Sequence, residues 1–425
     1  MSDNPVQDCH GPADVPRLHQ LIRNFERWIA LTGEEVSRRE TLRDAITARL
    51  QSQVKNVTFA SFGSMETGLS TPLSDIDVGF SPAKEDDSLS AKRVRDIAEQ
   101  KLFRMRKYCD HMRSVQNPWV TKKARVPVLY LNHTLSNTDF HIAANKPSAT
   151  QVSLIKGWLD EFPLLRPLYF TVKTALDVRG LTDAANGGLG SYTLICMIVG
   201  YIRLAARPSH DDPGTALWEF LDFYAHFNTR VSGMAVDPPS IFRKRGAHTT
   251  PSAALRDAMQ ENEVLYWQHE MSLANPQRPW LLTIQDPNDM ANDLGKSCYR
   301  IMDIRMTFRV LAERLQRWLT SPKRQTDDPL LPFFGKMLGA VRDRRRHFLR
   351  WARLPADRRR FAVEESSSAR DVLDVRFVGA KEERPVFDVE RGLEPDSGRV
   401  PDGPPLDSHA DTEASAARRG PPLVW

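Results

Sequence analysis

The residues that could do chemistry gather in one short stretch between Phe62 and Phe80. Gly63 and Ser64 end a run with strand character, and after ten intervening residues Asp75 and Asp77 stand in the next such run. Residues i and i+2 of a strand face the same side, so the two carboxylates are predicted to lie side by side. Paired carboxylates suit a hard divalent cation. Gly63 would let the backbone approach a phosphate, to which the Ser64 hydroxyl could donate.

A third acid, Asp139, lies in the segment TDFHI, which also has strand character. With Asp75 and Asp77 it could complete a cluster for two Mg²⁺ or Mn²⁺ ions. Two ions suit in-line displacement at phosphorus, because one activates the attacking oxygen and the other steadies the leaving group. An isolated Asp-x-Asp is also common on solvated strands, but the upstream Gly-Ser at this spacing favours the metal site.

The elements that must position these residues predict an α+β fold. Strands are expected at residues 57–62, 76–80, 126–131 and 138–142, and from residue 146 onward the apolar pattern is helical throughout. A small mixed-sheet domain is therefore inserted in a larger helical domain, with a cleft between them. The expected parts are a disordered 1–16, helices at 17–55 that pack on the helical domain, a catalytic domain at 56–146, a helical domain at 147–322, and a basic helix with a disordered tail at 323–425.

Composition excludes several classes of protein. The 425 residues are 41% hydrophobic and 27% charged, and they contain no uncharged apolar run of about 18 residues, so no membrane span is expected. The four cysteines form no CxxC, which argues against zinc fingers and a disulfide framework. The first residues are acidic and show neither a secretory nor a clear mitochondrial signal. A reducing compartment is expected.

Positive charge is concentrated near the C-terminus. The net charge is +5, and residues 323–360 hold twelve Lys/Arg against four Asp/Glu. The segment RDRRRHFLRWAR, residues 342–353, interleaves arginines with Phe348 and Trp351, a pattern that suits RNA phosphates and stacked bases. A solvated basic helix or an import signal is an equal alternative. The sequence has no RRM signature, zinc knuckle or KH-type loop.

Four segments resemble the DNA polymerase beta-like nucleotidyltransferase superfamily. They are FGSMETGLSTPLSDIDVGF; KKARVPVLYL with TDFHI; WLDEFPLLRPLYFTVKTALDVRGL with GGLGSYTLICMIVGYI; and LTIQDPNDMANDLGKSCYRIMDI. Within that superfamily the order of segments is similar to the terminal RNA nucleotidyltransferases with a PAP-associated domain, and most of all to the nuclear poly(A) polymerases of TRAMP complexes. The resemblance covers about residues 17–320. It implies a nucleotidyltransferase palm for the mixed-sheet domain.

The resemblance assigns roles to further residues. Asp75, Asp77 and Asp139 would bind metal and be catalytic, and Gly63 and Ser64 would bind the nucleotide phosphates. The other nucleotide-binding residues would be Lys173, Ser191, Tyr192 and Asn292. Taken alone, Lys173 could be a solvated lysine and Tyr192 a core aromatic residue. The chain departs from the family at Asp177, where some relatives have a second lysine. It also departs at Ala144, which stands where uridylyltransferases of the family often have an asparagine for the ribose, with Asn145 directly after it.

The implied activity is template-independent addition of AMP from ATP to an RNA 3′ end. Asn292 stands where uridylyltransferases of the family have a histidine, and its shorter side chain leaves room for a purine, so ATP is preferred. A terminal uridylyltransferase, an antibiotic-modifying nucleotidyltransferase and an inactive RNA-binding scaffold are the alternatives. The resemblance also implies a zinc-knuckle RNA-binding protein and a helicase of a TRAMP-like complex as partners, and a nuclear location, with the cytoplasm as the alternative.

Overall fold

The structure is a computed structural model that describes residues 17–82, 90–121, 126–144, 149–205, 212–246, 249–320 and 329–355. All of them lie in the first of two compact units, Met1–Ser367. Within this part of the chain, no helix is both long and apolar enough to cross a membrane. The stretches expected to be disordered, residues 1–16 and the tail beyond 355, lie outside the described residues, as does Asn145.

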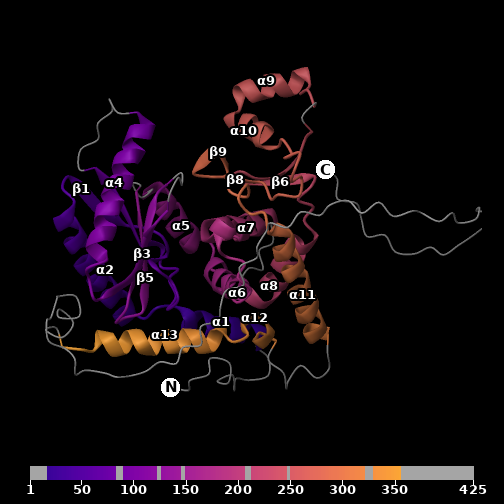
Figure 1. The fold of residues 1–425 in the computed structure, drawn as a ribbon. Coiled ribbons are helices and arrows are strands. Elements are labelled where there is room, and N and C mark those ends of the chain that lie inside the picture. The colour runs from indigo at the N-terminus through magenta and orange to yellow at the C-terminus, as the bar shows by residue number, and fades with distance from the viewer. Residues whose placement is uncertain are drawn as a thin grey trace, which may run out of the picture. The chain divides into compact units, whose positions relative to one another are not determined.

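Five strands form a sheet (Figure 1), with Asp77 on one of them and Asp75 directly before that strand. Its strands are β1 (Val57–Ser61), β2 (Ile76–Pro82), β3 (Val115–Val120), β4 (Val128–His133) and β5 (Thr138–Ala143), in the order β1-β2-β5-β4-β3. β2 and β5 are parallel and the other neighbours antiparallel, so the expected mixed sheet and α+β class are confirmed. The sequence predicts four of these strands. It misses β3, an edge strand that contains Pro118, because proline interrupts a strand pattern and is tolerated at edges.

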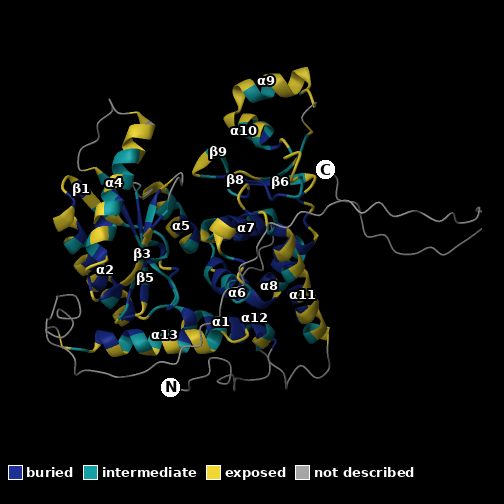
Figure 2. Cartoon of the chain, viewed as in Figure 1, coloured by how far each residue is buried: buried dark blue, intermediate teal, exposed yellow. Residues whose placement is uncertain are grey.

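One face of this sheet is apolar and the other is polar. Alternate residues of β4 and β5 are buried against helices α2 (Gly33–Gln53) and α4 (Ala91–Cys109): Leu129, Leu131, Phe140 and Ile142. Asp139 and His141 alternate with them and are half-buried on the opposite face. The strands of this sheet carry both buried and half-buried residues (Figure 2). The strand period of two thus turns the chemistry-bearing residues away from the core.

The two N-terminal helices divide between the two cores of the molecule. α1 (Arg17–Ile29) packs on the helical domain through Leu21 and Phe25. α2 instead contributes Leu42, Ile46 and Leu50 to the core under the sheet. These three residues are spaced by four and form one helical face, which is the face that the sheet covers. The expectation that residues 17–55 pack on the helical domain is therefore wrong for α2.

The basic helix α13 (Met337–Ala352) closes the sheet's core from the other end of the described chain (Figure 1). Phe348 and Trp351 are only 2% and 6% exposed and belong to that core. The interpretation in which these two rings stack on RNA bases is therefore wrong. Spacing alone did not distinguish a ring on the buried face of a basic helix from a ring offered to a ligand.

The larger core is built from helices (Figure 1). They are α1, α5 (Ala149–Glu161), α6 (Leu165–Asp177), α7 (Ser191–Ala205), α8 (Pro213–His226), α11 (Ile301–Thr320) and the short α12 (Leu331–Phe334). α7 is buried from Thr193 to Ile202, as its apolar sequence predicts. The smaller helices are α3 (Ser64–Thr67), η1 (Ala184–Asn186), α9 (Ala253–Glu261) and α10 (Glu263–Met271).

A second sheet interrupts the helical domain. Its strands are β6 (Ser232–Val236), β7 (Pro239–Arg243), β8 (Ile284–Asp286) and β9 (Asp289–Asp293), in the order β7-β6-β8-β9. The expectation of helices throughout residues 147–322 is wrong here. Strands of three to five residues are too short for a period of two to stand out in sequence. The hairpin β8–β9 carries Asn292.

Candidate active site

A pocket of about 610 Å³ opens between the five-stranded sheet and the helices α5, α6 and α7. Seven of the nine residues predicted for the site line it: Gly63, Ser64, Asp75, Asp77, Lys173, Ser191 and Tyr192. These residues come from two segments, 63–77 and 173–192, that are far apart in the chain. Asp139 and Asn292 are not among the lining residues.

The turn after β1 is shaped by Gly63. Its φ of 73° lies in the left-handed region, and a Cβ placed there would come within 2.3 Å of Asp77 Oδ2. Only glycine therefore permits this turn beside the acid. Ser64 follows as the first residue of α3, and its Oγ accepts a hydrogen bond of 3.0 Å from Ser70. The hydroxyl proton of Ser64 is thus the one that can be donated to a ligand.

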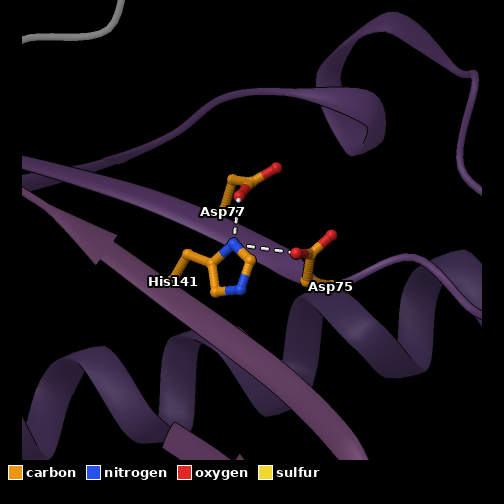
Figure 3. Close-up of side chains that lie close together, drawn as sticks. All are labelled: Asp75, Asp77 and His141. Atoms are coloured by element: carbon orange, nitrogen blue, oxygen red, sulfur yellow. Dashed lines mark ion pairs between the residues drawn. The ribbon is translucent and has the colours of Figure 1, made fainter. Parts of the chain in front are cut away.

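Asp75 and Asp77 meet a histidine that the sequence did not predict. Asp77 on β2 pairs with His141 on the parallel strand β5. The imidazole Nδ1 lies 2.8 Å from Asp75 Oδ2 and 3.4 Å from Asp77 Oδ1 (Figure 3). One ligand atom from each of the three residues lies within 4.8 Å of the others, so they form a candidate cation site. The available sequence signal was the alternation of TDFHI, which puts His141 on the face of Asp139.

The charges of this group are strongly coupled. Burial disfavours the charged imidazole, but its hydrogen bonds to Asp75 and Asp77 outweigh burial and raise the pKa of His141 to about 10. Burial and the neighbouring carboxylate Asp75 raise the pKa of Asp77. For Asp75 the effect of burial is overcome by His141, which lowers the pKa of that carboxyl. The imidazolium thus supplies the positive charge that the carboxylate pair requires.

Asp139 stands apart from this group. It faces the same side of β5 as His141, but its Oδ1 accepts a hydrogen bond of 2.7 Å from Asn132 Nδ2. Its Oδ2 lies 3.6 Å from the Arg344 guanidinium of α13. The described structure therefore brings two of the three predicted acids together and places the third beside an arginine.

Lys173 of α6 supplies a positive charge to the pocket. Its Nζ lies 3.1 Å from Asp177 Oδ1, one helical turn away. Burial disfavours the ammonium, but the Asp177 carboxylate outweighs this effect and raises the pKa of Lys173. Asp177, where the sequence departs from the family, thus keeps Lys173 charged. Ser191 begins α7, where backbone N–H groups favour an anion.

Tyr192 is connected to Asn292 through a buried acid. The Tyr192 hydroxyl donates to Asp286 Oδ1 over 2.9 Å, and Asn292 Nδ2 donates to Asp286 Oδ2 over 3.0 Å. Lys296 Nζ in turn donates to Asn292 Oδ1 over 3.0 Å. Asp286 is only 5% exposed and was not predicted from the sequence. Asn292 thus lies two hydrogen bonds from the pocket-lining tyrosine, on a hairpin that fixes its orientation.

Parts of the chain are similar to known proteins. Residues 18–157 match the family model of the central palm domain of the mitochondrial-like poly(A) RNA polymerases. The chain is 27% identical over 358 residues to the poly(A) RNA polymerase cid14 of Schizosaccharomyces pombe, which covers 79% of this chain and 48% of that protein. The acid pair Asp75 and Asp77 thus lies in a region that is similar to this palm domain. The chain spans about half the length of the relative from Schizosaccharomyces pombe.

Two solved structures share the fold of this chain. The polymerase core of TRAMP, an RNA surveillance complex, has a TM-score of 0.56 at 23% identity and covers 76% of this chain and 93% of its own. Cid1 in complex with the UTP analog UMPNPP has a TM-score of 0.53 at 18% identity and covers 74% and 97%. The palm match ends within α5. The likeness to these structures therefore concerns the helical domain of this chain as well.

Proposed function

We propose that the chain is a template-independent RNA 3′-terminal nucleotidyltransferase that adds AMP from ATP. The observation that carries the proposal is that a glycine-serine turn, a carboxylate pair and a charged lysine line the same pocket. The turn and the lysine suit a triphosphate, while the carboxylates suit the cations that accompany it. The family of the palm and the relative from Schizosaccharomyces pombe support the same reaction.

The donor atoms at the acid pair fit divalent cations. Asp75 and Asp77 crowd two carboxylates into a partly buried site, which is favourable only with a positive charge between them. In this proposal they hold the cations together with Asp139, which exchanges Arg344 for a cation. When bound, two Mg²⁺ or Mn²⁺ ions would activate the RNA 3′ oxygen for attack on the α-phosphorus and stabilise the leaving pyrophosphate.

The remaining residues would bind and orient ATP. Gly63 lets the triphosphate approach the backbone, and Ser64 donates its hydroxyl proton to the β- or γ-phosphate. Lys173 acts as a point charge on the phosphates, because its ammonium has three donors and no fixed plane. Ser191 adds a hydroxyl at the start of α7. Tyr192 stacks under the base, an interaction that tolerates any base.

Base choice is proposed to depend on Asn292. Its side chain is short and half-buried, so it leaves room for a purine, which favours ATP. The amide is held by Asp286 and Lys296, so its orientation is fixed by the protein rather than by the nucleotide. UTP is the alternative substrate.

A primer-extension assay tests the proposal. The purified chain is incubated with a labelled oligoribonucleotide, Mg²⁺ or Mn²⁺, and each NTP separately. Stepwise extension with ATP is expected, and Asp77→Ala serves as the inactive control. Extension with UTP alone would make the chain a uridylyltransferase. RNA binding without extension by any NTP would make it a scaffold.

The proposal extends to partners and location. The palm and the helical domain contain no recognisable sequence-reading module, so we propose that a zinc-knuckle RNA-binding protein and a helicase join the chain in a TRAMP-like nuclear complex. The likeness to the TRAMP polymerase core supports this assembly. Affinity purification of the tagged chain, with imaging of its location, tests it. A chain purified alone from the cytoplasm would contradict it.

A further inference from the structure

A row of rings crosses the polar face of the palm sheet and ends at the acid pair. In the strand register, Trp119 of β3 is opposite Tyr130 of β4, Tyr130 is opposite His141 of β5, and His141 is opposite Asp77 of β2. Trp119 and Tyr130 are stacked, with centroids 4.3 Å apart and planes 6° apart. Tyr130 and His141 pack edge to face, with ring centroids 4.5 Å apart. These residues therefore form a continuous path from the sheet edge to the candidate cation site.

The outer end of this row is open to solvent. Trp119 is 51% exposed even though it is stacked on Tyr130. The opposite face of the same strands carries the apolar core, so the row takes no part in that core. Large aromatic side chains offered to water next to a polar site are typical of ligand contacts.

The backbone of β3 is irregular where it presents Trp119. The register of β3 and β4 shifts between Gln116 and Trp119, and Asn117 has a φ of 54°. A β-bulge re-aims the side chains that follow it, and bulges are frequent beside active sites. Pro118 is tolerated at this edge because it needs no ladder hydrogen bond there. The edge is therefore built in a way that fixes the direction of one tryptophan.

A second row, of amides, runs beside the rings. Gln116 Nε2 donates to Asn132 Oδ1 over 3.1 Å, and Asn132 Nδ2 donates to Asp139 Oδ1. Neutral rings and amides have one advantage over lysines at this position: they can bind a nucleic acid without pairing with the catalytic carboxylates. Among the described residues, Arg344 shows the opposite case, since it pairs with Asp139.

We propose that Trp119 and Tyr130 form a stacking platform for the 3′-terminal bases of the RNA acceptor. The inference rests on the proposed function, because the acceptor's 3′ oxygen has to reach Asp75 and Asp77. Trp119 lies three strand spacings from β2, about 14 Å in a sheet. A short single strand stacked on the rings would therefore direct its 3′ end toward the acids. Neither ring lines the pocket assigned to ATP, so acceptor and nucleotide occupy separate places.

Direct binding of an unreactive acceptor tests the platform without catalysis. The probe is a 3′-deoxy oligoribonucleotide with 2-aminopurine near its 3′ end, whose fluorescence falls on stacking. Trp119→Ala is expected to weaken binding about five- to a hundredfold, from the usual effect of one stacked base, and to abolish the quenching. Trp119→Phe keeps a ring and should restore most of both. The melting temperature and the KM for ATP should not change.

Two controls complete the experiment. Tyr266→Ala removes another exposed ring, 43% exposed and in a ring pair with Trp267 on α10, and should leave RNA affinity unchanged. An acceptor with abasic 3′-terminal positions should bind the wild type as weakly as the normal acceptor binds Trp119→Ala. Equal affinity and quenching in wild type and Trp119→Ala would overturn the platform alone. Failure of the wild type to bind any RNA would overturn the proposed function as well.

Discussion

Three side chains of the palm lie in contact with one another: Asp75, Asp77 and His141. The imidazolium lies within hydrogen-bonding distance of both carboxylates, which is the place where a divalent cation is proposed to bind. Without a metal, the imidazolium offsets part of the charge of the two carboxylates, and a bound cation would take over that role. This arrangement lets the palm fold without a metal while keeping two acids together.

Removal of one acid is expected to stop catalysis and spare the fold. Asp77→Ala should reduce nucleotide transfer at least about a hundredfold, because one electrostatic contact to the reacting group is lost. Stability should change little, because burial and Asp75 already disfavour the charged form of Asp77. Primer extension and thermal melting measure the two effects. Near wild-type extension by Asp77→Ala or Asp75→Ala would show that the catalytic assignment is wrong.

Gly63→Ala is expected to damage the same site through the backbone. The new Cβ would meet Asp77 Oδ2 at 2.3 Å, and alanine is strained at a φ of 73°. The strain should cost about 1–3 kcal/mol and move the acid, so activity should fall together with stability. Gly157→Ala is the matched control, because nothing lies within 4 Å of its added Cβ and it sits inside helix α5. Urea unfolding and primer extension measure the two effects. Equal stability and equal activity of Gly63→Ala and Gly157→Ala would contradict the prediction.

Asn292→His is expected to shift nucleotide use toward UTP. The imidazole adds bulk where a purine would lie and offers an N–H to a pyrimidine carbonyl. One such hydrogen bond is worth about 0.5–1.5 kcal/mol, so the ATP/UTP ratio of kcat/KM should fall roughly three- to tenfold. Asp289→His, on the exposed part of the same hairpin, is the control. An unchanged ratio in Asn292→His would place base choice elsewhere.

The sequence predicts residues with a local pattern better than residues joined by the fold. Asp75 and Asp77 share a strand face by spacing alone. His141 reaches them only through the parallel pairing of β2 and β5, and Asp286 reaches Tyr192 only through the hairpin β8–β9. Neither contact can be inferred from spacing, because strand register is a long-range property. The position of Asp139 depends likewise on Arg344, about two hundred residues away.

At the scale of elements, α13 joins parts of the chain that are distant in sequence. Arg345 donates to the backbone oxygens of Trp28 and Ala30, each over 2.7 Å, and pairs with the buried Glu35 at 2.8 Å. Its neighbour Arg344 pairs with Asp139. The basic residues of this helix thus fix the link between α1 and α2, and the position of a proposed catalytic acid.

Truncation after Gly339 is therefore expected to unfold the palm. It would remove Phe348 and Trp351 from the core, and loss of one such ring costs about 3–5 kcal/mol. Truncation after Pro355 retains α13 and should melt like the full chain. A melting temperature of the truncation after Gly339 close to that of the full chain would contradict the role of α13 in the core.

The elements themselves were predictable where their patterns were long. The strands that carry the acids and the helices of the larger core follow from periods of two and 3.6. The second sheet and β3 were missed because short strands and a proline leave no clear period. The sequence predicts the wrong core for α2. An amphipathic face shows that a helix packs against a core, but it does not show which core that is.

The stability of the whole molecule is expected to depend on pH through His133. Burial lowers its pKa to about 4, and the backbone N–H of Ser136 donates to its Nδ1, which fits a neutral ring. The unfolded chain takes up a proton near pH 6.5 and the folded chain near 4, so stability is full above 6.5 and falls as pH drops through this window. The free energy of unfolding should fall by about 3 kcal/mol across this pH range.

Urea unfolding at pH 7 and pH 5 measures this effect. His133→Gln should flatten the slope between these values, whereas His226→Gln should not, because His226 is exposed on α8. His141 acts in the opposite direction. Its pKa is raised to about 10, so its stabilisation is present below 6.5 and is lost as pH rises toward 10. A His133→Gln slope equal to that of the wild type would assign the acid sensitivity to other groups.

Because Phe348, Trp351 and Ala352 complete the palm core, a ribosome must release residue 352 before that core can close. The strands of the palm are synthesised early, and all of α5 to α12 follows before α13 emerges. Domains usually fold in the order in which they are made. Here the domain whose strands are made first is the last to be finished. A nascent chain therefore carries part of the palm's apolar surface uncovered throughout synthesis of the helical domain, and this is the surface that chaperones would have to protect.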